Sequence, residues 1–298
     1  MFRKFIKNLC FFCIALASIY GLQRFCHKQT DGFAISKIRE ITPTSFHPNN
    51  SEEEKKLALS ILKQPLSYIG RGGQCYAFTT QDQKYVVKLL KYNNNYPRIW
   101  FRLFPLPFGL ESYRQKKLAT KQKKLQGEYT SYQIAATELK EETGILYFHL
   151  DEEKLPSINL HIQDRLGIFH TLPADRYQFY IQKKGTPFYP GIKKLLENET
   201  LESAKKALDT LTEYLVKRCQ KKITDKDDGI WRNFAFYEGQ PFQIDIGQFC
   251  YIPSLDSKEA YRKDLLFFTK DFRRWLEEIS PPLAQYFLDA IYQETDLE

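Results

Sequence analysis

A hairpin centred on Gly239 constrains the fold of this chain most strongly. Apolar stretches flank this glycine and predict two short strands joined by a tight turn. Asn233 and Asp245 are each six residues from Gly239, so the two should face each other, with α-carbons roughly 4.5–5.5 Å apart. An amide oxygen and a carboxylate would then converge, and a second carboxylate, Asp228, lies five residues before Asn233. Hard oxygen ligands of this kind suit a magnesium ion that phosphates also hold.

A glycine-rich turn and a lysine strand lie upstream, within residues 66–90. Gly70, Gly72 and Gly73 interrupt a pattern of strand, turn, strand, turn and strand. Glycines let a backbone approach phosphates without a β-carbon in the way. Lys88 follows Val86-Val87 and precedes two leucines, so it belongs to a half-buried strand. Taken alone, such a turn is usually structural and such a lysine usually points to solvent.

In this order and spacing, the motifs resemble those of the protein-kinase-like superfamily. The stretch Asp228-x4-Asn233 is similar to a kinase catalytic loop, and Asp245-Ile246-Gly247 is similar to the magnesium-binding Asp-Phe-Gly. The resemblance implies ATP and Mg²⁺ as cofactors. It also implies a role for each residue: the three glycines cover the phosphates, Lys88 holds the α- and β-phosphates, Asn233 and Asp245 bind the metal, and Asp228 orients or deprotonates the acceptor hydroxyl.

A helix over residues 123–142 supplies one further candidate, Glu128. Its apolar stripe includes Leu125 and Tyr132, the i−3 and i+4 neighbours of Glu128, which therefore lies at the edge of that stripe. By resemblance, Glu128 would pair with Lys88. Glu138 is the other candidate on this helix, and an ordinary solvated carboxylate is the simpler interpretation of either.

Several departures from the kinase pattern leave the function open. Cys75 occupies the place of the third glycine, Lys226-Asp227 replaces the usual His-Arg, and only 53 residues follow Asp245. This resembles small kinase-like enzymes that act on sugars, lipopolysaccharide core or small molecules. The first hypothesis is a phosphotransferase that moves the ATP γ-phosphate to a hydroxyl on a sugar, lipid or protein acceptor. The alternative is a catalytically inactive pseudokinase that acts as a scaffold or nucleotide sensor, and a third hypothesis is an accidental likeness.

The predicted fold is α+β, with the two lobes of a kinase-like protein behind an N-terminal membrane anchor. Residues 1–30 form the anchor, and 31–62 a linker with a first helix from Glu52 to Leu62. Residues 63–184 form an N-lobe, with further strands near 145–150, 157–163 and 177–182. The C-lobe, 185–298, holds a helix near 200–219, the catalytic loop, the metal-binding hairpin and helices at 257–279 and 282–294.

The N-terminal segment predicts the localisation. Residues 8–23 carry no charge, and residues 5–23 provide a span that basic residues flank on both sides. An uncleaved single-pass anchor is favoured over a cleaved signal peptide, because the apolar run continues past Ala15-Leu16-Ala17. A buried helix is a third alternative, and the charge difference between the flanks is too small to fix the side of the membrane.

Residues 94–124 form an insertion with eight basic residues and one acid, within a chain of net charge +8. Its stretch 98–108 mixes aromatic and basic residues, which suits the interface of an anionic membrane. Packing under the sheet is the alternative for these aromatics. Because basic residues concentrate in two patches only, the composition argues against nucleic acid as a partner.

Overall fold

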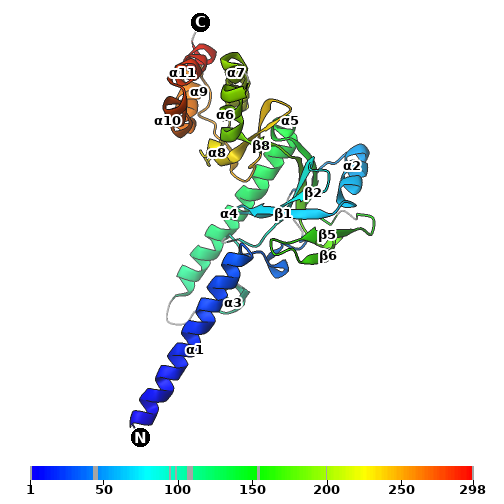
Figure 1. Ribbon diagram of the computed structural model, residues 1–298, viewed down its shortest axis with the longest axis vertical. Coiled ribbons are helices and arrows are strands. Elements are labelled where there is room, and N and C mark those ends of the chain that lie inside the picture. The colour runs from blue at the N-terminus through cyan, green and yellow to red at the C-terminus, as the bar shows by residue number, and fades with distance from the viewer. Residues whose placement is uncertain are drawn as a thin grey trace.

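The chain is a mixed α+β protein, as predicted. The computed structural model describes residues 2–42, 46–93, 95–97, 99–105, 110–152, 155–198 and 200–296. Helix α1 (Phe2–Gln29) and the paired helices α3 (Ile99–Leu103) and α4 (Glu111–Thr137) project from one end of the molecule. The C-terminal helices lie at the opposite end, with the large sheet between (Figure 1).

One helix in the described part of the chain is long and apolar enough to cross a membrane. This span covers Ile6–Gln29, has a mean hydropathy of 1.6 and buries none of its surface inside the molecule. Signal sequences share this length and composition, so the two favoured alternatives for the N-terminus both fit this helix. The third, a buried helix, is wrong for the described side chains, because Phe11, Phe12 and Ile19 are about 60% exposed or more.

A seven-stranded sheet occupies the middle of the molecule, in the order β4-β7-β3-β2-β1-β5-β6. Neighbouring strands are antiparallel except for the parallel pair β1–β5. The strands are β1 (Leu66–Arg71), β2 (Cys75–Thr80), β3 (Tyr85–Leu90), β4 (Ile145–His149), β5 (Asn159–Gln163), β6 (Phe169–Pro173) and β7 (Phe179–Lys183). The sequence pattern misses β6, an edge strand in which only Leu172 is buried, so the apolar alternation of a half-buried strand is absent.

The helices before β4 confirm one prediction and correct another. α2 (Glu52–Leu62) has the predicted bounds and begins with a capping box between Ser51 and Glu54. The helix predicted at 123–142 is instead α4 (Glu111–Thr137) followed by the single turn α5 (Lys140–Thr143). Its first half is polar and largely exposed, so it carries no apolar stripe that periodicity could detect.

The C-terminal part is mainly helical and matches the predicted elements with small differences. It contains α6 (Phe188–Asn198), α7 (Leu201–Gln220), α8 (Ile230–Asn233), α9 (Lys258–Phe268), α10 (Lys270–Ile279) and α11 (Pro281–Thr295). Its short strands are β8 (Thr186–Pro187), β9 (Ile223–Asp225), β10 (Phe234–Tyr237), β11 (Gln240–Gln243) and β12 (Phe249–Tyr251). The helix predicted at 257–279 is broken at Thr269, and α6 was not predicted because Pro190 and Gly191 lie in its first turn.

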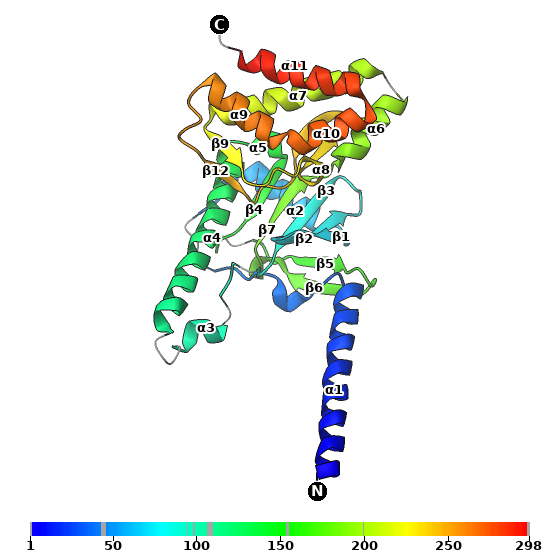
Figure 2. The same ribbon diagram turned by 90° about the vertical axis from the view of Figure 1, so that its left-hand side faces the viewer.

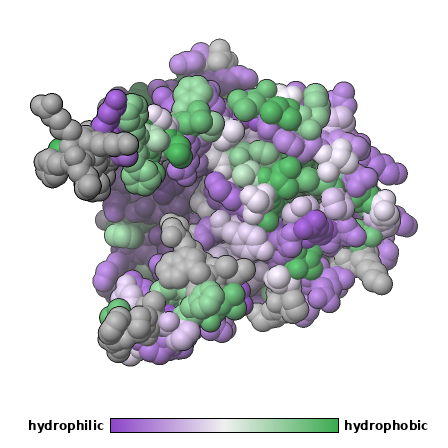
Figure 3. All heavy atoms as spheres, turned by 90° about the horizontal axis from the view of Figure 1, so that it is seen from below, coloured by the Kyte–Doolittle hydropathy of each residue, from purple (hydrophilic) through white to green (hydrophobic). Residues whose placement is uncertain are grey.

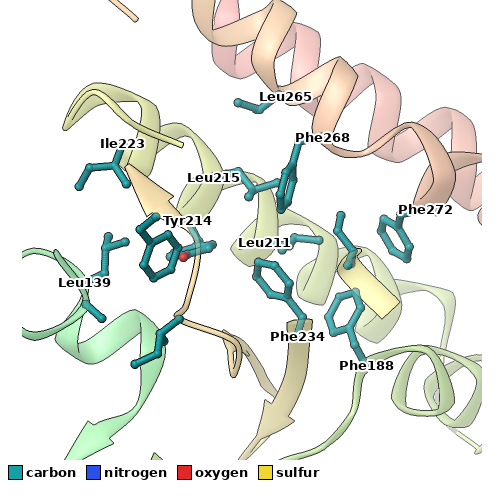
Figure 4. Packing of buried hydrophobic residues seen from close by; sticks show 14 of the residues in the cluster. Leu139, Phe188, Leu211, Tyr214, Leu215, Ile223, Phe234, Leu265, Phe268 and Phe272 are labelled. Carbon is teal, nitrogen blue, oxygen red and sulfur yellow. The ribbon is translucent and has the colours of Figure 1, made fainter. Parts of the chain in front are cut away.

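Two clusters of buried hydrophobic side chains hold these elements together. One lies within residues 33–181 and packs α2 and the 3₁₀ turns η1 (Ile35–Lys37) and η2 (Ala174–Arg176) near one face of the sheet. The other joins the sheet and α4 to the C-terminal helices. Figure 4 shows its centre, where Phe188, Phe234 and Phe272 lie beside Leu211 of α7 and Phe268 of α9. This second cluster fixes the β10–β11 hairpin against the helices behind it.

The hairpin forms as predicted, but its register differs by one residue. Tyr237 pairs with Gln240, so the turn is the two residues Glu238-Gly239, both with positive φ (50° and 78°). Such a turn matches the right-handed twist of the strands. Continuing the register places Asn233 opposite Ile244 rather than opposite Asp245, which corrects the predicted pairing.

Candidate functional site

Lys88 reaches from the sheet to the segment that follows β11 and leads to the candidate metal ligand Asp245. Its Nζ donates a hydrogen bond of 2.5 Å to the carbonyl oxygen of Ile244, the residue before Asp245. The same ammonium group lies 5.4 Å from the centroid of the Tyr180 ring. Both charged groups act on the partly buried Cys75 thiol, whose pKa burial and Asp245 raise and Lys88 lowers. The glycine turn, Lys88 and Asp245 therefore lie close together.

Asn233 and Asp245 are adjacent through the backbone despite the shifted register. The Asn233 carbonyl accepts hydrogen bonds from the amides of Ile244 (2.7 Å) and Asp245 (3.3 Å). Asn233 is fully buried, its Nδ2 donates to the Asp227 carbonyl (3.1 Å), and its Oδ1 has no hydrogen-bond partner among the described residues. Asp245 is exposed and accepts a bond of 3.1 Å from the Gly247 amide.

These two side chains fit a magnesium ion in their donor chemistry. A buried amide oxygen without a partner costs free energy that a cation would recover. Among the described residues no group of three or more histidines, cysteines or acids could hold a metal by itself. One amide and one carboxylate instead suit an ion that takes its other oxygens from phosphates and water.

Two adjacent aspartates lie in the loop before Asn233. Asp228 is half-buried and forms an ion pair of 3.3 Å with Lys270 of α10. Asp227 accepts from the Arg232 guanidinium (2.6 Å) and from the Gly229 amide (3.1 Å). This local bonding is also what an ordinary turn would make. The two carboxylates thus differ: Asp227 bonds within its own loop, and Asp228 points out of the loop toward Lys270 of α10.

Asp225 is a buried acid that sequence reasoning missed. Burial raises its pKa to about 7, against the opposing effects of Arg218 and of the hydrogen bond from the Asp227 amide, and the negative charge of Asp245 adds to the increase. Gln243 Nε2 donates to Asp225 (2.5 Å) and to the Asp245 carbonyl (3.1 Å), and Tyr214 donates to Gln243 Oε1 (2.6 Å). A chain of buried polar contacts of this kind has no periodic signal, so only the structure reveals it.

Glu128 does not pair with Lys88, which corrects the predicted ion pair. Its carboxylate binds the Arg39 guanidinium (2.7 Å), and both side chains are 1% exposed. Tyr132, Asn93 and Asn95 also donate to it, at 3.0–3.3 Å. Arg39 comes from a segment that bridges the ends of β3 and β7, and its planar fork reaches Glu128 where the lysine does not.

The glycine turn between β1 and β2 touches the segment after Asp245. Gln74, a residue that the sequence did not single out, donates from Nε2 to the Gly247 carbonyl (3.1 Å). A Cβ at Gly247 would lie 2.0 Å from Gln74 Oε1, so any other residue there would require the Gln74 side chain to move. Gly70 and Gly73 have open space around their missing side chains, and Gly72 has only the Cys75 sulfur within 4 Å.

A cavity of about 560 Å³ lies beside this contact, between the turn, α4 and the segment 247–250. Glu128 and Gln74 are among its lining residues, together with the basic side chains of Lys123, Lys124 and Lys226. Since Arg39 neutralises Glu128, the lysines leave the cavity with a net positive character, which suits an anionic ligand.

Comparisons with known proteins find similar solved structures but no similar family model or curated sequence. No protein-family model matches the chain, and no curated protein is significantly similar to it in sequence. Structural neighbours include crystal structures of WbdD. The high-resolution structure is 14% identical, covers 76% of this chain and 44% of its own, and has a TM-score of 0.35. A second, of "the bifunctional kinase-methyltransferase WbdD", is 14% identical over 76% and 43%, with a TM-score of 0.33.

A co-crystal structure of WbdD with the kinase inhibitor LY294002 is 12% identical over 78% of this chain and 46% of that one, with a TM-score of 0.35. The chain thus spans less than half the length of these structures. Likeness at this level carries no argument about function, which has to come from the site itself.

Proposed function

We propose that this protein is a membrane-anchored, kinase-like phosphotransferase that moves the γ-phosphate of ATP to a hydroxyl acceptor. The observation that carries the proposal is the hydrogen bond from Lys88 to the carbonyl of Ile244. Through it, a lysine of the sheet lies at the end of the hairpin that bears Asn233 and Asp245. Among the described residues the Asn233 Oδ1 has no hydrogen-bond partner and Asp245 is exposed, so both side chains are available to a cation that phosphates also hold.

The residues would act mainly by positioning and by neutralising charge. Gly70, Gly72 and Gly73 would cover the phosphates, with Lys88 beneath them. Asn233 and Asp245 would hold Mg²⁺, and Asp228, oriented by Lys270, would accept the proton of the acceptor hydroxyl. ATP bound with Mg²⁺ supplies the phosphoryl group.

One hydrophobic cluster supports a separate N-lobe, because it lies wholly within the proposed N-lobe, 63–184, and its preceding linker. The other cluster crosses the proposed boundary near residues 184–185 and joins the sheet and α4 to the helices of the proposed C-lobe, 185–298. At this boundary the chain packs closely against the β10–β11 hairpin, because a Cβ at Gly185 would lie 2.5–2.8 Å from Phe242, Ala235 and the Phe236 carbonyl. Residues 31–62 form the linker and first helix, and α1, within residues 1–30, the single-pass anchor.

The experiment that tests this function measures nucleotide binding and turnover on the full chain in detergent micelles. Wild type should bind Mg-ATP and release ADP, faster with an acceptor from a panel of sugars, lipids and proteins. Asp228→Ala should bind nucleotide equally well and lose turnover. Asp256→Ala, which removes an exposed acid outside the site, is the matched control and should behave as wild type.

One observation favours the alternative, a pseudokinase that serves as a membrane-tethered scaffold or nucleotide sensor. Glu128 is committed to Arg39, so the ion pair that holds the lysine of an active kinase is not made. Equal binding with no turnover in wild type and Asp228→Ala would favour this alternative. Failure of wild type to bind any Mg-nucleotide would refute both.

A further inference from the structure

The end of α1 is fixed to the sheet, so the helix leaves the molecule in a defined direction. Asp31, two residues after α1, forms an ion pair with Arg71 (3.0 Å) and accepts a hydrogen bond from Tyr68 (2.8 Å). The next residue, Gly32, accepts from the buried Tyr76 hydroxyl through its carbonyl (2.8 Å). These contacts hold the residues just after α1 against the strands β1 and β2.

The turn between β5 and β6 lies beside this exit point and exposes apolar side chains. Arg165 in the turn is 4.0 Å from Asp31. It lines one cavity with Arg24 and Lys28 of α1 and with Arg71. The neighbouring residues Leu166, Ile168 and Phe169 are 51%, 52% and 73% exposed. Exposed leucine, isoleucine and phenylalanine within one turn, framed by arginines, are unusual for a surface that faces only water.

A second apolar group projects toward the same end from α3 and the first turns of α4. Figures 1 and 2, which view the molecule from directions 90° apart, both place α3 and this part of α4 level with α1. Leu103 and Phe104 are 67% and 65% exposed, and Leu110 and Tyr113 are 51% and 53% exposed. Residues 98 and 106–108 of the stretch 98–108, which was expected to meet a membrane, lie outside the described residues, as do Gly109 and the side chains of Ile99 and Trp100.

Basic side chains accompany this second group as well. Arg102 lies within α3, and Lys116 and Lys117 lie about one turn after Tyr113 along α4. All three side chains are exposed. Seen from this end, the surface shows separate hydrophobic patches among hydrophilic atoms (Figure 3). Two apolar groups, each with its own cations, thus lie on either side of the helix that could cross a membrane.

We propose that this end of the protein is a docking face for an anionic lipid bilayer, made by the β5–β6 turn and the α3–α4 tip. The proposal rests on α1 being a membrane anchor, which is part of the proposed function, but not on catalysis. Continuity with α1 and the pairing of apolar with basic side chains select a bilayer as the occupant. Apolar side chains enter the interface and cations bind lipid phosphates.

The docking face sets the height of the candidate site above the bilayer. α4 continues from Lys117 to Glu128, and eleven residues of α-helix rise roughly 16 Å. Glu128 lines the basic cavity next to Gly247, so a charged head group would reach this cavity across a short distance. The class of acceptor that fits best is therefore a hydroxyl on a lipid-borne, anionic molecule.

Quenching by brominated lipids tests the docking face on the full chain. The protein is reconstituted in vesicles of equal parts phosphatidylcholine and phosphatidylglycerol, with or without bromine on the acyl chains. Phe104→Trp and Phe169→Trp report on the two apolar groups. Phe267→Trp is the matched control, since Phe267 is 63% exposed and lies on α9 at the opposite end. Phe12→Trp, within α1, reports on the anchor.

The emission added by Phe104→Trp and by Phe169→Trp should fall in brominated vesicles, and the emission added by Phe267→Trp should not. Quenching in α1 alone would overturn the docking face while leaving the anchor intact. No quenching in α1 would overturn the anchor and this proposal together. Equal quenching at all positions would mean adsorption without orientation and would also contradict it. Nucleotide turnover does not enter the readout, so failure here and failure of the proposed function are distinguishable.

Discussion

The ion pair between Arg39 and Glu128 is the most deeply buried charge contact near the site. Burial alone lowers the pKa of Arg39, but Glu128 and the surrounding tyrosines raise it overall. The guanidinium also lies 4.5 Å from the Tyr96 ring centroid, while its Nε and Nη1 have no hydrogen-bond partner in the part of the chain that the structure describes. A pair of this kind stabilises α4 against the segment around Arg39, which pairs with the ends of β3 and β7, only as long as both partners are present.

Arg39→Met should therefore destabilise the protein, because it leaves the Glu128 carboxylate buried and uncompensated. We expect a loss of about 3 kcal/mol in the free energy of unfolding, measured by urea denaturation in micelles. Arg39→Met combined with Glu128→Gln should recover much of this loss. Arg176→Met, which removes an exposed arginine that pairs with Glu40, is the control and should have little effect. An unchanged midpoint in Arg39→Met would contradict the structural role.

Asp225 predicts a pH dependence of stability. Its pKa is raised from an ordinary value of 3.8 to about 7 in the folded protein, mainly by burial. The folded state thus binds this proton more tightly than the unfolded state, and stability from this group is full below about pH 4 and is lost as the pH rises through 7. Urea denaturation across this window should show the decline, and Asp225→Asn should flatten it. An unchanged slope in this variant, or a flattened slope in Asp256→Asn, would exclude Asp225 as the cause.

At the level of elements, the β10–β11 hairpin carries a residue that fits its turn poorly. Glu238 adopts a positive φ of 50°. This conformation costs free energy for residues with a β-carbon, although less for asparagine than for most, and glycine adopts it freely. Glu238→Asn should stabilise the protein by about 0.5–1 kcal/mol, measured as a shift of the urea midpoint. Glu238→Gln keeps the same backbone cost and should give no gain. Equal midpoints for the two variants would show that the turn is not strained.

Elements with a strong apolar period could be predicted from the sequence, and elements without one could not. α2, α7 and the strands of the glycine turn have buried faces whose spacing fixes their type. β6 and the first half of α4 are exposed, so nothing in their spacing reveals them. The hairpin was predicted with a register error of one residue, because the choice between a two-residue and a three-residue turn depends on backbone conformation.

For the candidate site as well, residues in local motifs could be predicted from the sequence, and contacts between distant segments could not. Lys88, Asn233 and Asp245 could be proposed from the sequence because their local motifs have fixed spacing, and they remain predictions. The partner of Glu128 was wrong, since Arg39 lies 89 residues away and no local pattern relates the two. Asp225 and Gln74 were missed for the same reason: each owes its place to contacts between distant segments.

At the level of the whole molecule, the candidate site joins segments that different parts of the chain hold in place. The glycine turn belongs to the seven-stranded sheet, whereas residues 244–250 follow the hairpin packed on the C-terminal helices. The contacts between them pass through a few side chains, among them Lys88 with Ile244 and Gln74 with Gly247. A ligand bound between them would add contacts to both at once.

Mg-ATP should therefore protect both segments from hydrogen exchange in the full chain. We expect slower exchange in residues 70–76 and in residues 244–250 together, because ligand binding lowers the population of locally opened states. Lys88→Met should abolish the joint protection. Lys183→Met is the control and should retain the joint protection. Lys183 lies on β7, the strand next to β3, and its Nζ is 4.5 Å from the Tyr237 ring centroid. Protection of one segment without the other would mean that the nucleotide does not bridge the sheet and the hairpin, and that the site as proposed is not formed.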